Sequence, residues 1–170
     1  MGDPIALSIG AATECDLAAV AELAGVIWRS HYPGIITTEQ IDYMLALGYS
    51  HAALSRFIEE EGAGLDLARF GDRLAGFAAY YLSEGGRELK LDKLYVLQEF
   101  QGRGVGSRLI AATETRARAQ RCSALILNVN KNNVQAIRAY EKNGVAIREA
   151  VVVDIGNGFV MDDFVMAKPL

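Results

Sequence analysis

A glycine-rich segment has the clearest chemical capacity in this chain. It reads Gln101-Gly102-Arg103-Gly104-Val105-Gly106-Ser107 and lies between an expected strand and an expected helix. Glycines allow backbone N–H groups to approach a ligand closely, and the N-terminus of a helix adds free N–H donors and the positive end of a dipole. The segment therefore predicts an anion-binding loop.

Two familiar phosphate-binding loops do not match this segment. The dinucleotide fingerprint requires a third glycine where this chain has Ser107, and a Walker loop requires Gly-Lys-Ser or Gly-Lys-Thr, which is absent. For the glycine loop taken alone, two alternatives stay open. One is a tight strand-to-helix turn without a ligand, and the other is a nucleotide-binding structural domain.

A second motif lies downstream, between Asn133 and Gly144. The residues there follow the pattern Asn-x-x-Ala-x-x-x-Tyr-Glu-Lys-x-Gly, and the upstream loop follows Gln-x-x-Gly-x-Gly. The two motifs in this order resemble the GNAT N-acetyltransferase superfamily, which uses acetyl-coenzyme A (acetyl-CoA). The resemblance is strong over about residues 88–148 and loose over roughly residues 65–167.

The resemblance implies how the cofactor is held. Backbone N–H groups of the glycine loop would bind its pyrophosphate, with Arg103 adding charge, and the pantetheine arm would bond to the backbone of the preceding strand where that strand and the next splay apart. Asn133 matches an asparagine that contacts the arm. The implied cofactor-binding residues are Leu94, Val96, Leu97, Gln101, Gly102, Arg103, Gly104, Val105, Gly106, Ser107 and Asn133.

Tyr140 is the first candidate catalytic residue. It matches the family tyrosine whose hydroxyl lies near the thioester sulfur. The thiolate that leaves has a conjugate acid of pKa about 8.5, and a phenol of pKa about 10 can hydrogen-bond to it or protonate it. Backbone N–H groups near Val96 would polarise the acetyl carbonyl. The alternative for Tyr140 is a helix tyrosine packed in the core.

Asp92 is the candidate general base. A primary amine with a pKa of about 10.4 is almost fully protonated at pH 7, so the site must accept a proton. Period-two alternation along the strand that ends at Val96 places Lys90, Asp92, Leu94 and Val96 on one face. Some family members carry a glutamate where this chain has Lys90, so Glu88 is the reserve. Lys90 also leaves open a non-catalytic module that senses acyl-CoA.

The acceptor pocket is less well defined by the sequence. Trp28, His31 and Tyr32 lie where the loop after the family's first helix borders this pocket, and the alternative is packing at a helix end. The C-terminal segments 151–154 and 161–168 are similar to bacterial spermine/spermidine acetyltransferases and also to enzymes that acetylate protein N-termini. We therefore expect a small polyamine-like amine, with a protein N-terminal or lysine amine as the alternative.

Acidic residues could attract such an amine. Candidates are Glu84, Glu88, Asp92, Asp162 and Asp163, although scattered surface acids are the ordinary explanation of a net charge of −4. Cys15 and Cys122 have no histidine or basic partner nearby in the sequence, which favours direct transfer without an acyl-enzyme. His31 and His51 lack a third ligand at a recognisable spacing, so we expect no metal.

The elements that must position these residues follow from hydrophobic periodicity. Strands are expected at 5–9, 65–70, 74–82, 89–97, 124–129, 146–154 and 159–167. Helices should start at Thr13, Thr38 and Ser50, and two more should span 107–121 and 134–143. The order predicts an α+β fold with helices on both faces of one mixed sheet. The resemblance implies a GNAT-like, mostly antiparallel sheet of about seven strands.

Composition limits the remaining classes. The 170 residues, 51% of them hydrophobic, suffice for a single N-acetyltransferase domain over 1–170. The net charge disfavours nucleic acid as a partner. Met1–Pro4 lack the basic patch of a secretion signal, and no apolar run is long enough for a membrane span. With two cysteines, we expect a cytoplasmic protein, and whether the chain forms a homodimer stays open.

Overall fold

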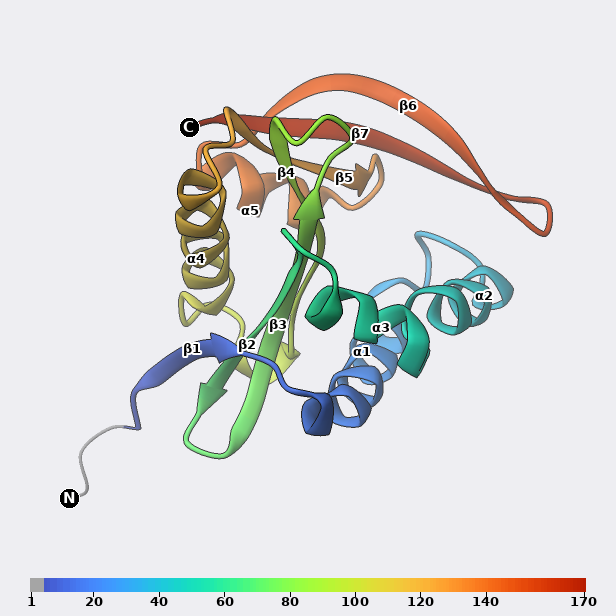
Figure 1. Cartoon of the computed structure of the whole chain (residues 1–170). Helices are drawn as coiled ribbons and strands as arrows, with labels where there is room; N and C mark the ends of the chain where they lie inside the picture. Colours follow the sequence, from blue (N-terminus) through green and yellow to red (C-terminus); the bar gives the residue numbers. More distant parts are fainter. Residues whose placement is uncertain (1–4) are drawn as a thin grey trace.

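One seven-stranded sheet forms the centre of the molecule, as the computed structural model of residues 5–170 shows (Figure 1). The strands lie in the order β1-β2-β3-β4-β5-β7-β6, and the pair β4 and β5 is parallel whereas the other neighbours are antiparallel. The strands are β1 (Leu7–Ala11), β2 (Gly64–Phe70), β3 (Arg73–Leu82), β4 (Glu88–Val96), β5 (Ala124–Asn130), β6 (Ala146–Gly156) and β7 (Phe159–Pro169).

Helices cover both faces of this sheet. They are α1 (Leu17–His31), α2 (Thr38–Gly48), α3 (His51–Glu59), α4 (Val105–Ala119) and α5 (Val134–Lys142), with short 3-10 turns η1 (Glu14–Asp16) and η2 (Gln98–Phe100). Figure 1 shows α1–α3 on one side and α4 on the other, with the long β6–β7 hairpin reaching over toward α2. The expected α+β fold is therefore confirmed.

Two hydrophobic cores form because each face of the sheet is apolar. Leu109, Leu125 and Met166 are buried in the core under α4 and α5. Leu17 and Phe77 are buried in the core under α1–α3. Burying a side chain of this size contributes about 1.5–3 kcal/mol, so the two cores hold the helices against the sheet.

Helix starts follow local capping chemistry. The Thr13 N–H donates to Asp16 Oδ2 at 2.8 Å at the turn before α1, and Ser50 Oγ accepts from the Ala53 N–H at 3.1 Å at the start of α3. The cap of α2 is Thr37, whose Oγ1 accepts from the Gln40 N–H at 3.2 Å, and not Thr38 as expected. Adjacent threonines offer the same hydroxyl, so the sequence does not distinguish them.

Several expected boundaries shift by two residues. The strand expected at 5–9 is observed as β1 at Leu7–Ala11. The helix expected from Ser107 begins at Val105, and the strand expected to end at Asp154 continues to Gly156. The expectation that Met1–Pro4 contain no secretion signal concerns residues outside those that the structure describes. Within residues 5–170, no helix has the length and hydrophobicity needed to cross a membrane.

Candidate active site

The parallel strands β4 and β5 separate at their carboxyl ends. Their pairing runs from Glu88 and Ala124 to Leu91 and Leu127 and then stops, although both strands continue. The edges that face each other beyond this point therefore lack a ladder partner, and such backbone groups can bond to a ligand. The separation opens into a cleft of about 650 Å³.

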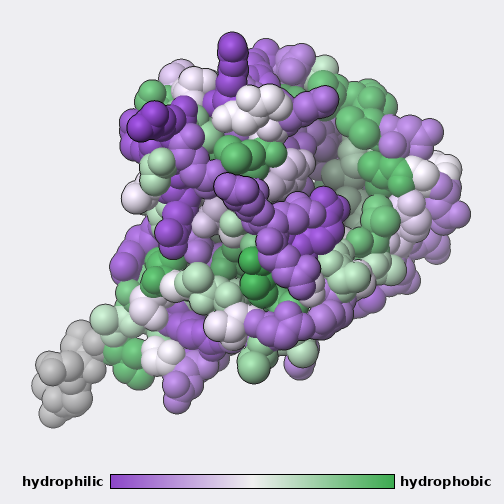
Figure 2. Space-filling model, viewed as in Figure 1, coloured by the Kyte–Doolittle hydropathy of each residue, from purple (hydrophilic) through white to green (hydrophobic). Residues whose placement is uncertain are grey.

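The walls of this cleft come from both sides of the sheet. They include α1 and α2, the ends of β4 and β5, the start of α4, one face of α5, and the β6–β7 hairpin. Figure 2 shows the surface hollowed where the hairpin faces α2, with hydrophobic residues along its border. A mostly apolar cleft with a few polar groups is the usual form of a small-molecule site.

The glycine loop leaves the start of α4 open toward this cleft. Gly102 and Gly104 have φ of 73° and 77°, and a Cβ at either position would meet no atom within 4 Å. Thr37, Ser50 and Asn133 cap α2, α3 and α5, but no side chain caps α4 and its first turn contains no acidic residue. The first N–H groups of α4 thus remain available to an anion, as a pyrophosphate requires.

Most of the residues implied for cofactor binding line the cleft. These are Leu94, Val96, Gln101, Gly102, Gly104, Val105, Gly106, Ser107 and Asn133. Leu97 and Arg103 are not among the lining residues. The Leu97 N–H bonds back to the Ala75 carbonyl on β3 at 2.8 Å, and the Arg103 guanidinium lies 5.6 Å from the centre of the Phe100 ring.

Asn133 has two structural partners in addition to its place in the cleft. Its Oδ1 lies 3.0 Å from His31 Nε2 and accepts from the Ala136 N–H at 3.4 Å. The first contact joins the last residue of α1 to the loop before α5, and the second caps α5. The sequence motif did not reveal this link, because His31 lies far away in the chain.

Tyr140 projects from α5 into the core under α4 and also lines the cleft. Its exposed fraction is 9%, and no side chain within residues 5–170 hydrogen-bonds to its hydroxyl. Burial raises the pKa of the Tyr140 phenol well above its usual value, and the neighbouring Tyr32 raises it further. The phenol is therefore neutral at physiological pH and can donate a hydrogen bond.

A β-bulge at Asp92 changes the predicted face of β4. Ala79 on β3 pairs with Lys93, and Tyr80 pairs with Leu91, so Asp92 is an extra residue without a partner. The prediction that Lys90, Asp92, Leu94 and Val96 lie on one face of the strand is therefore wrong. The leucines at 89, 91 and 94 and Val96 pack with the core under α4, whereas Tyr95 packs with the core under α1–α3.

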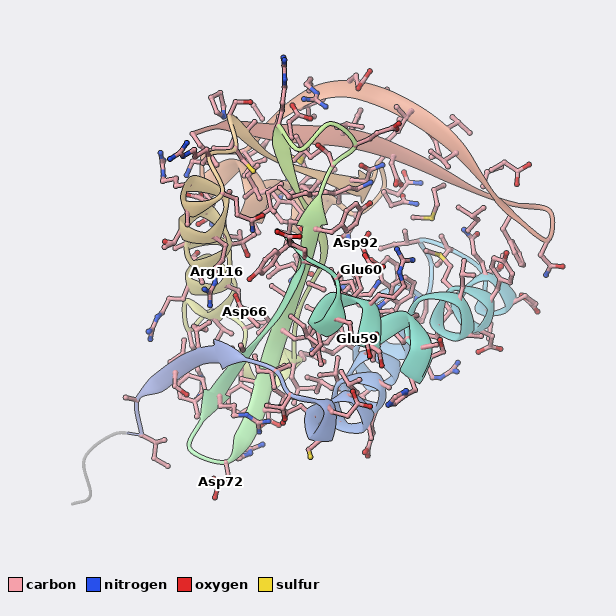
Figure 3. The ribbon with its side chains drawn as sticks, viewed as in Figure 1. Glu59, Glu60, Asp66, Asp72, Asp92 and Arg116 are labelled. Carbon is pink, nitrogen blue, oxygen red and sulfur yellow. The ribbon has the colours of Figure 1, made fainter. Side chains whose placement is uncertain are left out.

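The bulge directs Asp92 toward α3. Its Oδ2 lies 2.8 Å from Lys93 Nζ, which itself stands 4.7 Å from the centre of the Tyr49 ring. In Figure 3, Asp92 lies near Glu60, just beyond the end of α3. Asp92 still lines the cleft, but its charge is already balanced. Glu88, the reserve base, pairs with Arg148 at 2.7 Å and is not among the lining residues.

An aromatic wall closes the cleft on the side of α1. Trp28 Nε1 donates to the Tyr49 hydroxyl at 3.2 Å, and the hydroxyls of Tyr32 and Tyr95 lie 3.1 Å apart. Burial raises the pKa of Tyr32, Tyr49 and Tyr95, so these phenols are uncharged. Trp28, His31 and Tyr32, which the sequence places at the acceptor pocket, all line the cleft.

Asp163 is a cleft residue that sequence reasoning grouped with surface acids. It lies on β7 with an exposed fraction of 2% and lines the cleft. The sequence offers a weak signal that Asp163 is buried, since Asp163 directly precedes the apolar residues Phe164-Val165-Met166 of the same strand. Its burial depends on strands and helices from elsewhere in the chain.

Cysteines and metal ligands are not gathered at the cleft. Neither Cys15 nor Cys122 lines it, and burial raises the pKa of the Cys122 thiol. In the part of the chain that the structure describes, no three histidine, cysteine or acidic side chains are grouped closely enough to hold a metal ion.

Comparison with known proteins identifies the class. Residues 22–145 match the profile of the acetyltransferase (GNAT) family. This match covers more than half of the chain, so the chain belongs to that family. It is an N-acetyltransferase, and acetyl-CoA is its cosubstrate.

Similar proteins carry related names. An uncharacterized N-acetyltransferase of Mycobacterium tuberculosis is 26% identical over 152 residues, which cover 88% of this chain and 96% of that protein. The spermine/spermidine N(1)-acetyltransferase of Bacillus subtilis is 32% identical over 79 residues, 42% of this chain and 51% of the relative. The crystal structure of PaiA N-acetyltransferase from Thermoplasma acidophilum in complex with coenzyme A has a TM-score of 0.80, 22% identity and coverage of 97% and 99%.

Proposed function

We propose that this chain transfers the acetyl group of acetyl-CoA directly to a primary amine, with a small polyamine-like acceptor favoured. The observation that carries this proposal is the combination of an uncapped α4 N-terminus with the opening between β4 and β5, at which Tyr140 also lies. Acetyl-CoA supplies the activated acetyl thioester when it is bound.

Residues of the chain would hold both the pyrophosphate and the pantetheine arm of the cosubstrate. The N–H groups of residues 101–107 are suited to the pyrophosphate, because helix N-termini attract anions. The free edge of β4 beyond Leu91 is suited to the amide groups of the pantetheine arm, as in the addition of a strand to a sheet edge. Leu97 and Arg103 lie outside the lining of the cleft, so we assign them a smaller part.

Tyr140 would serve as the general acid. Its neutral phenol lines the cleft and has no side-chain hydrogen-bond partner within residues 5–170, so it can donate to a sulfur that gains negative charge. Asp92 is one candidate for the proton acceptor, with its Lys93 ion pair as the contrary observation. Because neither cysteine lines the cleft, we favour direct attack by the amine.

The acceptor would enter between the aromatic wall and the β6–β7 hairpin. The uncharged rings of Trp28, Tyr32 and Tyr49 offer apolar and π surface to an alkylammonium chain. The similarity to the Bacillus subtilis spermine/spermidine enzyme supports a polyamine. We also propose a cytoplasmic location, because Cys15 and Cys122 are both free thiols.

Thiol release in the presence of acetyl-CoA tests this function. Spermidine, spermine, an aminoglycoside, a lysine peptide and a peptide with a free N-terminus are the acceptors to compare. We expect release with at least one of them and the highest kcat/KM with a polyamine. Binding of acetyl-CoA without release on any of the five would contradict the proposed acceptor class.

A further inference from the structure

Asp163 is a buried carboxylate without a contact that balances its charge. Its exposed fraction is 2%, and its Oδ1 has no hydrogen-bond partner. Within residues 5–170 it forms no ion pair, although Asp162 beside it pairs with Lys131. Buried carboxylates are normally paired, because an isolated charge is costly away from water. Asp163 therefore lacks a cation in direct contact within residues 5–170.

The buried carboxylate of Asp66 can be compared with that of Asp163. Asp66 and Asp163 are the two buried acidic residues of the part that the structure describes. The Tyr80 hydroxyl bonds to Asp66, and the charge of Arg116 lies near it between β2 and α4 (Figure 3). Asp66 is outside the cleft, whereas Asp163 lines it. Asp163 is therefore the buried acid that has one oxygen without a partner and that a ligand can reach.

The surroundings of Asp163 place it close to the reacting groups. On β7 it pairs with Asn130, the last residue of β5, at the open end of the sheet. Its charge raises the pKa of Tyr32, the residue just after α1, and Tyr32 in turn raises the pKa of Tyr140 on α5. The Asn128 side chain on β5 hydrogen-bonds to the carboxylate without balancing its charge, and Lys90 on β4 and Lys131 beyond β5 act on it from longer range. Asp163, Tyr32 and Tyr140 all line the same cleft.

We propose that Asp163 receives the ammonium group of the acceptor amine and takes one of its protons. This inference rests on the proposed function and names the residue that selects its substrate. Asp92 and Asp163 are the two acidic residues that line the cleft, and Asp92 is already paired with Lys93. Asp163 is the one whose charge a cationic ligand would balance.

The proton step balances with the groups present. One N–H bond of the ammonium breaks, its electron pair stays on nitrogen, and an O–H bond forms at Asp163. The pair then forms the C–N bond to the acetyl carbon while the C–S bond breaks and its electrons leave on sulfur. Tyr140 protonates the sulfur and regains a proton from nitrogen through water, and Asp163 releases its proton to solvent. One ammonium and one thioester give one amide, one thiol and one proton.

Amine binding to the chain saturated with coenzyme A tests this proposal without requiring turnover. Calorimetry would measure the Kd of spermidine and of Nα-acetyllysine amide for the wild type, Asp163→Asn, Asp163→Ser and Asp162→Asn. We expect the two Asp163 variants to bind at least about 30-fold more weakly, as loss of a buried charge partner implies. Asp162→Asn, which removes an exposed neighbouring carboxylate, should stay within about twofold.

Two results would overturn the role of Asp163. The first is that the folded Asp163 variants bind the amines with the same Kd as Asp162→Asn. The second is that the wild type binds neither amine. Unchanged affinity for coenzyme A identifies the variants as folded. Thiol release measured on the same proteins separates the two proposals. Binding that depends on Asp163 without thiol release would contradict the acetyl transfer alone, and release unaffected by Asp163→Asn would contradict Asp163 alone.

Discussion

Leu91 and Leu127 are the last residues that pair β4 with β5. Both are buried in the core under α4, so the parallel ladder is fixed up to this pair. Beyond it, the bulge at Asp92 bends β4, and β5 runs on beside β7. The cleft between the strands is therefore a consequence of packing on one side and a bulge on the other.

Tyr140→Phe tests the general acid. The ring stays in the core while the hydroxyl is lost, so stability should change by less than about 1 kcal/mol. We expect kcat to fall about 10²-fold or more, with little change in the KM for acetyl-CoA, because the hydroxyl acts when the thiolate leaves. Tyr81→Phe is the matched control, since Tyr81 does not line the cleft. Equal kcat in the two variants would exclude this role.

Ser107→Asp tests the anion site at the start of α4. Ser107 is an exposed residue in the first turn of that helix. An acid there should stabilise the helix by about 0.3–1 kcal/mol, but it should repel a bound pyrophosphate and weaken coenzyme A binding at least about 10-fold. Ser107→Asn is the neutral control. Thermal melts and calorimetry should thus move in opposite directions, and an unchanged Kd would place the pyrophosphate elsewhere.

Asp92→Asn distinguishes the two carboxylates of the cleft. Lys93 would lose its partner although its side chain is only 11% exposed, so we expect the free energy of unfolding to fall by about 1–3 kcal/mol. If Asp163 is the proton acceptor, kcat/KM for the amine should change by less than about fivefold. A loss of about 10²-fold in kcat/KM by the folded variant would instead identify Asp92 as the base.

The stability of Asp163→Asn should depend on pH. Burial raises the pKa of the Asp163 carboxyl, and Asn128, Lys90 and Lys131 only partly oppose this. A raised folded-state pKa means that stability is full below the unfolded-state pKa and is lost as pH rises through the folded-state pKa. At pH 7.5 without ligand, the variant should therefore have a higher Tm than the wild type. The difference should be about 2–4 °C for each kcal/mol of destabilisation that the buried charge causes and the substitution removes. The difference should vanish near pH 3. A variant less stable at pH 7.5 would contradict an uncompensated charge.

Local sequence patterns were sufficient to predict the helices, the strands and the glycine loop. Apolar periodicity places the five helices and seven strands of residues 5–170 within a few residues, and the glycines of 101–106 lie where an open helix start needs them. The alternation from Glu88 changes phase at Asp92 and Lys93, where two polar residues stand together, so a strict period of two fails there and the sequence itself hints at the bulge. It is set by pairing with β3, which the strand does not encode alone.

Long-range packing determines the rest of the site. Asp163 resembles a surface acid in the sequence because its neighbour Asp162 is one, yet the β6–β7 hairpin turns it inward. The contact of His31 with Asn133 likewise joins the end of α1 to the start of α5. Such contacts depend on the order of the strands in the sheet, which the family resemblance implied only in outline.

A crystal structure of this chain with coenzyme A measures the central claim directly. We predict that the pyrophosphate lies on the N–H groups of residues 101–107 and that the pantetheine arm runs between β4 and β5. The sulfur should lie within about 3–3.5 Å of the Tyr140 hydroxyl. A cofactor bound outside this opening, or a sulfur that the Tyr140 hydroxyl cannot reach, would contradict it.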